Sequence, residues 1–324
     1  MSKDLDGNFS TSLPLSNKKK VDQSAPELSE LSDQDKPWDK HRYSADRVAN
    51  HYRGETDFDK YAQRMDFCSQ LLDFKLVPHA DLGELKLKLS AARFCRVRHC
   101  PVCQWRRSLK WKARALEALP LVVKDFPKHR WLFLTLTQKN CLVTELRKTI
   151  TEMNKSFIRL TKLKEWCVEG WIKSLEVTHG KDGNAHPHFH CLLMVPPSFF
   201  GRNYLKHDDW INLWQKSARL DYKPQVHIKA VSKKQNPSIL IPEILKYSLK
   251  ESDLYRNKEF LLEVTKQLHK TRCVSVGGVL RNYMSKIGEE PEDLIGQDTE
   301  KTVDEGHLYF DWQYDQKRYK LKDN

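Results

Sequence analysis

Hydrophobic and polar residues follow two different periods along the middle of this chain. A period of two, typical of half-buried strands, covers residues 131–137, 171–178, 188–194 and 225–231. Helical spacing covers residues 142–166 and 208–220. The predicted order is β-α-β-β-α-β, which most often folds as an α+β, ferredoxin-like antiparallel sheet with both helices on one face. In that arrangement the first and third strands lie side by side at the centre.

The flanking regions predict further helices. Residues 44–74 suit one or two amphipathic helices interrupted near Gly54. Residues 237–250 are expected to form a helix with a proline in its first turn. Residues 252–286 are expected to contain another helix and a turn at Gly277 and Gly278.

Composition divides the chain into four regions. Residues 1–43 are rich in polar and charged residues and are expected to be disordered. A helical and cysteine-containing region is expected over 44–128, and a catalytic domain over 129–286. The remainder, 287–324, should be an acidic linker and a tail whose aromatic residues 308–312 dock as a strand.

The charge of the chain indicates its class of partner. It has 56 Lys and Arg against 43 Asp and Glu, a formal net charge of +13, which favours a polyanion such as nucleic acid. Its 39% hydrophobic content suffices for a packed core. The absence of a long apolar run and of a signal core predicts a soluble cytoplasmic protein with no membrane partner, in which cysteines are reduced thiols or metal ligands.

The strand around residues 186–190 carries three histidines at alternate positions. His186, His188 and His190 share one face of the strand, whereas Phe189 and Cys191 share the other. Each imidazole has two nitrogens that need partners, so three of them fill a core poorly but hold a divalent cation well. The alternative interpretation is a structural histidine cluster.

A cysteine cluster precedes the predicted sheet. Cys100 and Cys103 flank a turn containing a proline, a spacing typical of half a tetrahedral zinc site, and Cys95 supplies a third thiolate. Cys68 is the preferred fourth ligand. His79 stays open as an alternative, and His99 is geometrically awkward beside Cys100.

The segment after the cysteines is predicted to be a basic helix. It carries five cations and two tryptophans, and it is expected to contact DNA phosphates. The five cations are Arg106, Arg107, Lys110, Lys112 and Arg114.

Glu243 and Tyr247 are four residues apart in the helix predicted over 237–250. Residues at this spacing share a helix face and are separated by about 6 Å of axial rise. A carboxylate and a phenol could therefore address the same small volume.

Three motifs together resemble those of rolling-circle plasmid replication initiators, in the single-tyrosine family of HUH endonucleases. They are residues 133–137 (FLTLT), 186–193 (HPHFHCLL) and 246–250 (KYSLK). The resemblance extends over about residues 65–285. It implies an HUH endonuclease core, ferredoxin-like or RRM-like, preceded by a small zinc-binding module.

The resemblance also implies roles for individual residues. In that family a histidine pair, here His188 and His190, binds Mg²⁺ or Mn²⁺. The tyrosine, here Tyr247, nicks one origin strand, forms a 5′-phosphotyrosine link and frees a 3′-hydroxyl, and a glutamate four residues earlier supports termination by hydrolysis or strand transfer. That glutamate is Glu243. A nearby cation should favour the phenolate, because a phenol with a pKa of about 10 is a weak nucleophile at neutral pH. Lys246 and Lys250 are the candidates.

The resemblance implies a third metal ligand on the preceding strand, Glu176, with His186 just outside the coordination shell. A three-residue loop at 182–184, with a left-handed residue, would place Glu176 opposite His190. A two-residue turn would place it opposite Phe189, away from the imidazoles. Hairpin geometry therefore tests the ligand assignment.

The implied partners are origin DNA, single-stranded at the nick site, and the host helicase, DNA polymerase and single-strand-binding protein. A homodimer stays open. The chain has no GxxxxGK[ST] phosphate-binding loop, so ATP hydrolysis is not expected. Two alternative functions are an HUH transposase or relaxase and a non-enzymatic, zinc-containing DNA-binding regulator. Relaxases usually place the tyrosine before the histidines, and only an endonuclease would form a covalent DNA adduct.

Overall fold

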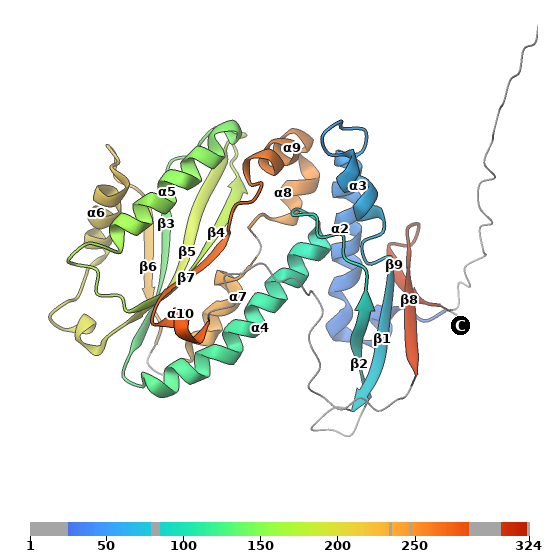
Figure 1. The fold of residues 1–324 in the computed structure, drawn as a ribbon, viewed down its shortest axis with the longest axis horizontal. Helices are drawn as coiled ribbons and strands as arrows, with labels where there is room; N and C mark the ends of the chain where they lie inside the picture. The colour runs from blue at the N-terminus through green and yellow to red at the C-terminus, as the bar shows by residue number, and fades with distance from the viewer. Residues whose placement is uncertain (1–24, 79–84, 233–234, 247, 285–305, 323–324) are drawn as a thin grey trace, which may run out of the picture.

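The computed structural model describes residues 25–78, 85–232, 235–246, 248–284 and 306–322. They form two parts, one built on a five-stranded sheet and the other on a four-stranded sheet with N-terminal helices (Figure 1). Helix α4 (Pro101–Asp125) contacts elements of both parts. The molecule therefore has the mixed α+β character predicted from the sequence.

The larger sheet is antiparallel, with strand order β6-β3-β5-β4-β7. Its strands are β3 (Arg130–Thr137), β4 (Gly170–His179), β5 (Ala185–Val195), β6 (Val226–Ala230) and β7 (Val274–Gly278). The first four strands have the predicted order in space, with β3 and β5 adjacent at the centre. β7 extends the sheet beside β4. It includes the two glycines that were expected to form a turn, so that expectation was wrong.

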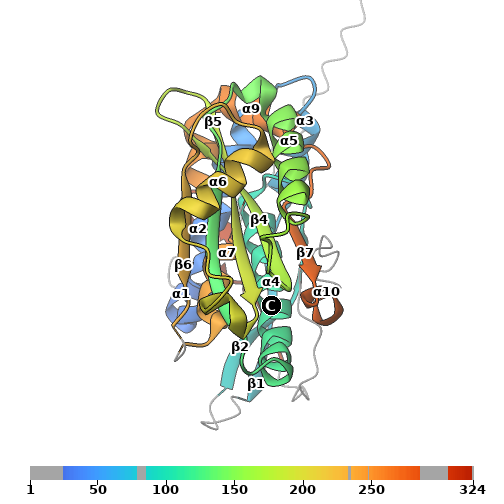
Figure 2. The same ribbon diagram turned by 90° about the vertical axis from the view of Figure 1, so that its left-hand side faces the viewer.

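Helices α5 (Leu146–Leu160) and α6 (His207–Ala218) cover one face of this sheet (Figures 1 and 2). Alternate residues of the strands, such as Leu134, Val177 and Phe189, are buried beneath them in the main core. The expected helix over 142–166 is shorter: a 3-10 turn, η2 (Val143–Glu145), precedes α5. A second 3-10 turn, η3 (Pro197–Phe200), follows β5.

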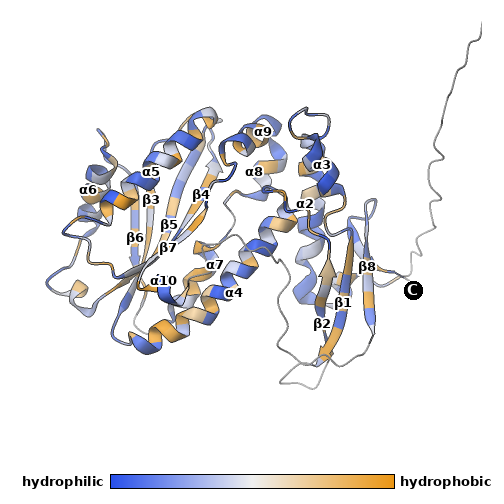
Figure 3. Cartoon of the chain, viewed as in Figure 1, coloured by the Kyte–Doolittle hydropathy of each residue, from blue (hydrophilic) through white to orange (hydrophobic). Residues whose placement is uncertain are grey.

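The opposite face was expected to be open and polar, and half of it is covered instead. The C-terminal half of α4, which Figure 3 shows as largely hydrophobic, packs there with α7 (Ile241–Ile244) and α10 (Leu280–Tyr283). These helices bury Leu192 and Met194 at the end of β5. The polar site is thereby confined to the other half of the face.

The second sheet joins segments from both ends of the chain. Its order is β2-β1-β8-β9, all antiparallel. Its strands are β1 (Leu71–Pro78), β2 (Leu85–Ala92), β8 (His307–Gln313) and β9 (Arg318–Leu321). The tail docks as a strand, as expected for 308–312, but it completes a sheet with β1 rather than forming a separate terminal region.

The N-terminal expectations need two corrections. Residues 25–43, expected to be disordered, contain α1 (Leu28–Leu31), η1 (Asp33–Asp35) and the beginning of α2 (Pro37–Tyr52), which buries Trp38. Residues 1–24 lie outside the described residues. The helices expected over 44–74 are α2 and α3 (Asp59–Asp66), and Gly54, with φ +76°, separates them. The end of that range is strand β1.

The helix predicted over 237–250 is also broken. The chain forms η4 (Pro237–Leu240) and α7, which ends at Ile244, and then continues to α8 (Glu251–Arg256) and α9 (Lys258–Gln267). The cause is a tertiary contact, because Ser248 and Leu249 run beside β4. Among the described helices, none has the length and hydrophobicity needed to cross a membrane.

Candidate active site

Glu176, His188 and His190 converge at the polar half of the five-stranded sheet. Glu176 Oε2 lies 3.0 Å from His188 Nε2 and 2.8 Å from His190 Nε2. All three side chains are largely buried, with Glu176 only 3% exposed. Two neighbouring strands therefore bring one carboxylate oxygen and two imidazole nitrogens to one point.

The register that produces this contact differs from the predicted one. Glu176 pairs with His188 rather than His190, and the loop between β4 and β5 has five residues, 180–184. Gly183 takes the left-handed conformation, with φ +79°. A shift of two residues keeps every side chain on its face, because the period of a strand is two. Glu176 therefore still faces the imidazoles, although it lies opposite a different one.

Both imidazoles are oriented through their second nitrogen. His188 Nδ1 lies 3.3 Å from the His186 carbonyl oxygen, and His190 Nδ1 lies 3.2 Å from Thr135 Oγ1. Phe133 also stacks on the His190 ring at a centroid distance of 5.6 Å. Without an ion, Nε2–H can donate to the Glu176 carboxylate. With a cation bound, Nδ1 would carry the proton of each ring and Nε2 would offer its lone pair to the ion, as in metal-ligating histidines.

The donor set fits a divalent cation. Mixed nitrogen and oxygen ligands suit Mn²⁺, and carboxylate oxygen suits Mg²⁺. Two ligands at about 2.1 Å from an octahedral ion lie about 3.0 Å apart when adjacent, close to the 2.8 and 3.0 Å seen here. Glu176, His188 and His190 could therefore hold a metal from one side. Their role as ligands stays a prediction.

Lys246 supplies a positive charge beside the triad. Its ammonium lies 2.8 Å from Glu176 Oε2 and 2.6 Å from Glu243 Oε1. Burial by itself would raise the pKa of the Glu176 carboxyl, but hydrogen bonds with His188, His190 and Lys246 hold it below its ordinary value. Glu176 is therefore ionised at neutral pH. Glu243 joins the site through Lys246 and remains half-exposed.

His186 stands beside this site and not within it. Its Nδ1 lies 2.7 Å from Asn140 Oδ1, and its ring centroid is 5.4 Å from that of His188. Burial, followed by the charge of His188, lowers the pKa of His186. The position agrees with the expectation that it lies just outside the coordination shell.

Tyr247 lies outside the described residues, whereas both of its neighbours contact β4. Lys246 reaches Glu176, and the Ser248 carbonyl accepts a hydrogen bond of 2.8 Å from the Val177 amide. The segment on either side of position 247 is therefore fixed at the strand that carries Glu176. The helix that carries Glu243 ends at Ile244, so the continuous helix predicted over 237–250 is absent, and the predicted shared face with Tyr247 lies outside the described residues. Lys250 is exposed and caps the start of α8.

The four cysteines predicted as a zinc site lie together in the second part of the molecule. All are buried, and three of the sulfur-sulfur distances are 3.6–3.7 Å: Cys68–Cys103, Cys95–Cys103 and Cys68–Cys100. A tetrahedral site with Zn–S bonds of about 2.3 Å has edges of about 3.8 Å. Amides of residues 95 and 97 also donate to the sulfurs of Cys68 and Cys95. The cluster could hold a metal.

The geometry bears on the ligands that the sequence left open. The fourth sulfur belongs to Cys68, and His99 is not among the four converging residues. His79 lies outside the described residues. Burial raises the pKa of the Cys100 thiol, and four packed thiols cannot all ionise unless a cation compensates their charge. A bound zinc ion would supply that compensation.

The five cations predicted to contact DNA lie along the N-terminal half of α4, each at least partly exposed. Some also have structural contacts. The Arg106 guanidinium packs 5.4 and 5.6 Å from the ring centroids of Trp38 and Trp105. Arg107 donates to the carbonyls of residues 96 and 98, and burial lowers the pKa of Lys112. DNA contact by Arg106, Arg107, Lys110, Lys112 and Arg114 stays a prediction.

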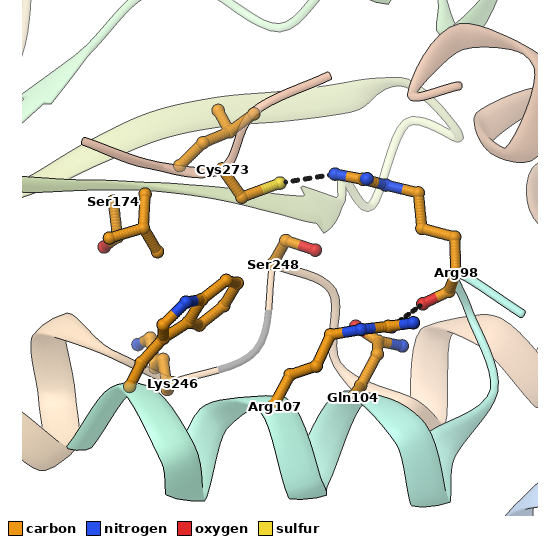
Figure 4. Close-up of a pocket in the computed structure, with 10 residues that line it drawn as sticks. Arg98, Gln104, Arg107, Ser174, Lys246, Ser248 and Cys273 are labelled. Atoms are coloured by element: carbon orange, nitrogen blue, oxygen red, sulfur yellow. Dashed lines mark hydrogen bonds between the residues drawn. The ribbon is translucent and has the colours of Figure 1, made fainter. Parts of the chain in front are cut away.

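Sequence analysis missed several residues near the site. Thr135 was part of a recognised motif, and its place opposite His190 follows from the predicted adjacency of the first and third strands. Arg98 and Gln104 were missed because only the tertiary fold brings α4 toward the segment around 246–248. Figure 4 shows their side chains in a small pocket with Lys246 and Ser248.

Comparison with known proteins gives a family and several relatives. The model of a family described as "Replication protein" matches residues 86–320. A "Protein rep" of Streptococcus pneumoniae serotype 2 is 36% identical over 212 residues, which cover 62% of this chain and 65% of the relative. The match to a "Protein rep" of Bacillus amyloliquefaciens is 31% identical and covers 80% and 85% of the two chains. That of Lentilactobacillus hilgardii is 31% identical and covers 88% and 95%. No solved structure matches the chain.

Proposed function

The chain belongs to the replication protein family, and on that premise we propose that it initiates plasmid rolling-circle replication by nicking one strand of origin DNA with Tyr247. The predicted resemblance to this family is confirmed by the match over residues 86–320. The observation that carries the nicking proposal is the convergence of Glu176, His188 and His190 beside the segment that contains Tyr247.

The proposed reaction is a transesterification at phosphorus. The Tyr247 phenolic oxygen bonds to the scissile phosphorus, and the bond from phosphorus to the 3′ oxygen breaks. The phenolic proton leaves to solvent, and the departing oxygen takes up a proton to become a free 3′-hydroxyl. The tyrosyl ester preserves the phosphodiester energy, so no nucleotide cofactor is needed. A host polymerase could extend the hydroxyl.

A bound Mg²⁺ or Mn²⁺ would polarise the scissile phosphate and neutralise charge that develops on it. Glu176, His188 and His190 would hold that ion. Lys246 keeps a positive charge beside residue 247, because its contacts with Glu176 and Glu243 raise its pKa even though burial opposes this. A cation in this place favours the phenolate form of a neighbouring tyrosine.

Glu243 is proposed to act after the first transfer. Its half-exposed carboxylate can accept a proton from a water or a 3′-hydroxyl that attacks the tyrosyl ester. Termination would then proceed by hydrolysis or strand transfer. The cysteine cluster is proposed to bind structural zinc, and the basic face of α4 to bind origin DNA. The host helicase, polymerase and single-strand-binding protein are proposed partners in elongation.

Covalent capture tests the nicking proposal. Single-stranded oligonucleotides tiled across the plasmid's double-strand origin, each labelled at its 3′ end, are incubated with the protein and Mn²⁺. The expected product is a labelled protein–DNA adduct that survives denaturing electrophoresis. Tyr247→Phe should abolish it, whereas Tyr204→Phe, a change at an exposed tyrosine after η3, should leave it unchanged.

The same assay separates the alternatives. Binding without an adduct for any origin oligonucleotide would favour a non-enzymatic DNA-binding regulator. An adduct that persists in Tyr247→Phe would assign the nucleophile to another residue. The relaxase alternative is disfavoured because Tyr247 follows the histidines in the sequence.

A further inference from the structure

A basic cavity of about 390 Å³ lies where the cysteine-rich region meets the end of α9. Its lining includes five cationic side chains and the exposed His269. The cations are Arg64 of α3, Arg96 and Arg98 of the cysteine loop, Arg107 of α4, and Lys270 just beyond α9. Among the described residues that line it, none is Asp or Glu. The cavity is therefore a site of concentrated positive charge outside the metal triad.

Three of the arginines donate hydrogen bonds to backbone carbonyls. Arg107 donates to the carbonyls of Arg96 and Arg98 at 3.2 and 3.4 Å. Arg64 donates to the carbonyl of Cys95, and Arg98 to that of Thr271. A carbonyl orients a guanidinium without neutralising it.

Two cations at the cavity have a backbone conformation that disfavours non-glycine residues. Arg96 has φ +56° and Lys270 has φ +57°. They come from different parts of the chain and line the same cavity. Such conformations persist where the surrounding structure imposes them and are concentrated at ligand sites. Glycine would fit both positions without strain, so each side chain can be removed without disturbing the backbone.

A buried histidine lies behind the wall of the cavity. His99 is 0% exposed, and neither of its ring nitrogens has a hydrogen-bond partner among the described residues. Buried polar groups in folded proteins nearly always have a partner, which includes bound water or ligand. Because solvent does not reach the His99 ring, it is part of the wall behind the cavity and not a ligand group.

The cavity adjoins the catalytic segment. Arg98 and Arg107 also line the small pocket of about 30 Å³ that contains Lys246 and Ser248 (Figure 4). Gln104 lines this pocket with a buried amide whose oxygen and nitrogen have no partner among the described residues. The two arginines thus link the neighbourhood of residue 247 to the basic cavity.

We propose that this cavity binds the phosphodiester backbone of DNA flanking the scissile phosphate, and that Arg96 and Lys270 are its phosphate ligands. The volume accommodates a backbone phosphate with part of its sugar, and the lining supplies Arg and Lys donors, with no carboxylate among the lining residues that the structure describes. The inference rests on the proposed function for the identity of the polyanion. It adds a contact site outside the metal triad, which shares Arg107 with the basic face of α4.

A glycine double variant tests the proposal without straining the fold. Arg96→Gly with Lys270→Gly removes both charges at positions where glycine is relaxed. The matched control is Arg219→Gly with Lys317→Gly, two exposed cations with φ +54° and +58° that do not line the cavity. Each variant loses two positive charges and two side chains, at positions where the backbone has the left-handed conformation. Thermal melting confirms that both are folded.

The measurement is fluorescence anisotropy in EDTA with labelled dT20 and with a 20-base-pair duplex, over a range of salt concentrations. For a single strand, each lost phosphate contact reduces the steepness of the plot of log affinity against log salt concentration by about 0.7. At 0.1 M salt this corresponds to a loss of affinity of roughly fivefold. The cavity variant should therefore lose about 25-fold for dT20. A loss confined to one probe identifies the bound DNA as single-stranded or duplex.

Equal affinities and slopes for the cavity variant and the control would overturn the proposal, whether both bind like wild type or both are weakened equally. The test of the cavity can succeed or fail independently of the test of the nicking proposal. A wild-type protein that binds DNA but forms no adduct would contradict the proposed nicking, and the comparison of the two glycine variants would still decide the cavity.

Discussion

Replacing Glu176 by glutamine isolates the carboxylate at the centre of the proposed metal site. The carboxylate is 3% exposed, and one of its oxygens contacts His188, His190 and Lys246 at 2.8–3.0 Å. Glutamine keeps the shape but has no charge and only one acceptor oxygen. The change therefore removes the anionic ligand and leaves both imidazoles in place.

The expected loss can be bounded from the contacts. Removing a group that merely orients a metal ligand typically costs 10- to 100-fold in metal affinity. Glu176 is proposed to be a ligand itself, so we expect Mn²⁺ to bind at least about 100-fold more weakly, or roughly 2.7 kcal/mol. Adduct formation at limiting Mn²⁺ should fall in parallel and recover in part as Mn²⁺ is raised.

Isothermal titration of the protein with MnCl₂ measures the affinity directly. Glu243→Gln is the matched control, because Glu243 bonds to the same Lys246 ammonium, at 2.6 Å, but lies outside the converging triad. It should bind Mn²⁺ as wild type does. Adduct yield against Mn²⁺ concentration provides a second readout on the same three proteins.

Two results would refute the reasoning. If Glu176→Gln bound Mn²⁺ with wild-type affinity, the carboxylate would not be a ligand, and His186 would become the candidate third ligand. If Glu243→Gln weakened binding as much as Glu176→Gln, the effect would be a general loss of negative charge around Lys246 rather than removal of a specific ligand.

Four further predictions follow from the structure. Cys100→Ser should lose most of the roughly one zinc per chain expected from atomic absorption, and a full zinc content would contradict the tetrathiolate site. Neutralising Lys110 and Arg114 together should weaken duplex binding and reduce its salt slope by about 1.8, and an unchanged slope would exclude them as phosphate contacts. Glu243→Ala should still form the tyrosyl adduct but accumulate it, whereas loss of the first nick would move Glu243 to the initial step. Burial lowers the pKa of Lys173 to about 8. At Lys173 the folded chain therefore binds fewer protons than the unfolded chain above that pH, and the contribution of this residue to the free energy of unfolding should rise by up to ~3 kcal/mol toward pH 10.5. Lys173→Met should abolish that rise in denaturant titrations.

The arrangement of the central sheet could be predicted because each element had a clear period. The strand and helix order leaves few antiparallel topologies, and the alternation of residues 186–194 places the imidazoles on one face whatever the exact pairing. The register itself could not be predicted. Loop length decides it, and the five-residue loop at 180–184 is not distinguished from a three-residue loop by the residues around Gly183.

The sequence failed where distant contacts override local preference. Residues 241–250 have a helical pattern, but hydrogen bonding of Ser248 to β4 draws the chain out of the helix after Ile244. Leu71 and Leu72 fit the helical spacing of the preceding segment, yet they pair with β8, more than two hundred residues away. The other neighbour of β1 is the nearby β2, but no local signal marks the pairing with a strand at the far end of the chain.

The cysteine cluster and the segment around the proposed nucleophile are joined by contacts on both sides of position 247, so loss of the proposed zinc is expected to affect the proposed nicking. Ser108 of α4 donates a hydrogen bond of 2.5 Å to the Leu245 carbonyl, two residues before Tyr247. On the other side, Glu251 contacts His41 of α2, whose ring stacks on Trp105, two residues after Cys103. The chain is therefore anchored to the cysteine-rich region both before and after the proposed nucleophile. Loss of the proposed zinc would loosen the start of α4 and with it both anchors. Cys100→Ser should therefore form less adduct even at saturating Mn²⁺. In Glu176→Gln, by contrast, the adduct yield should recover in part as the Mn²⁺ concentration is raised.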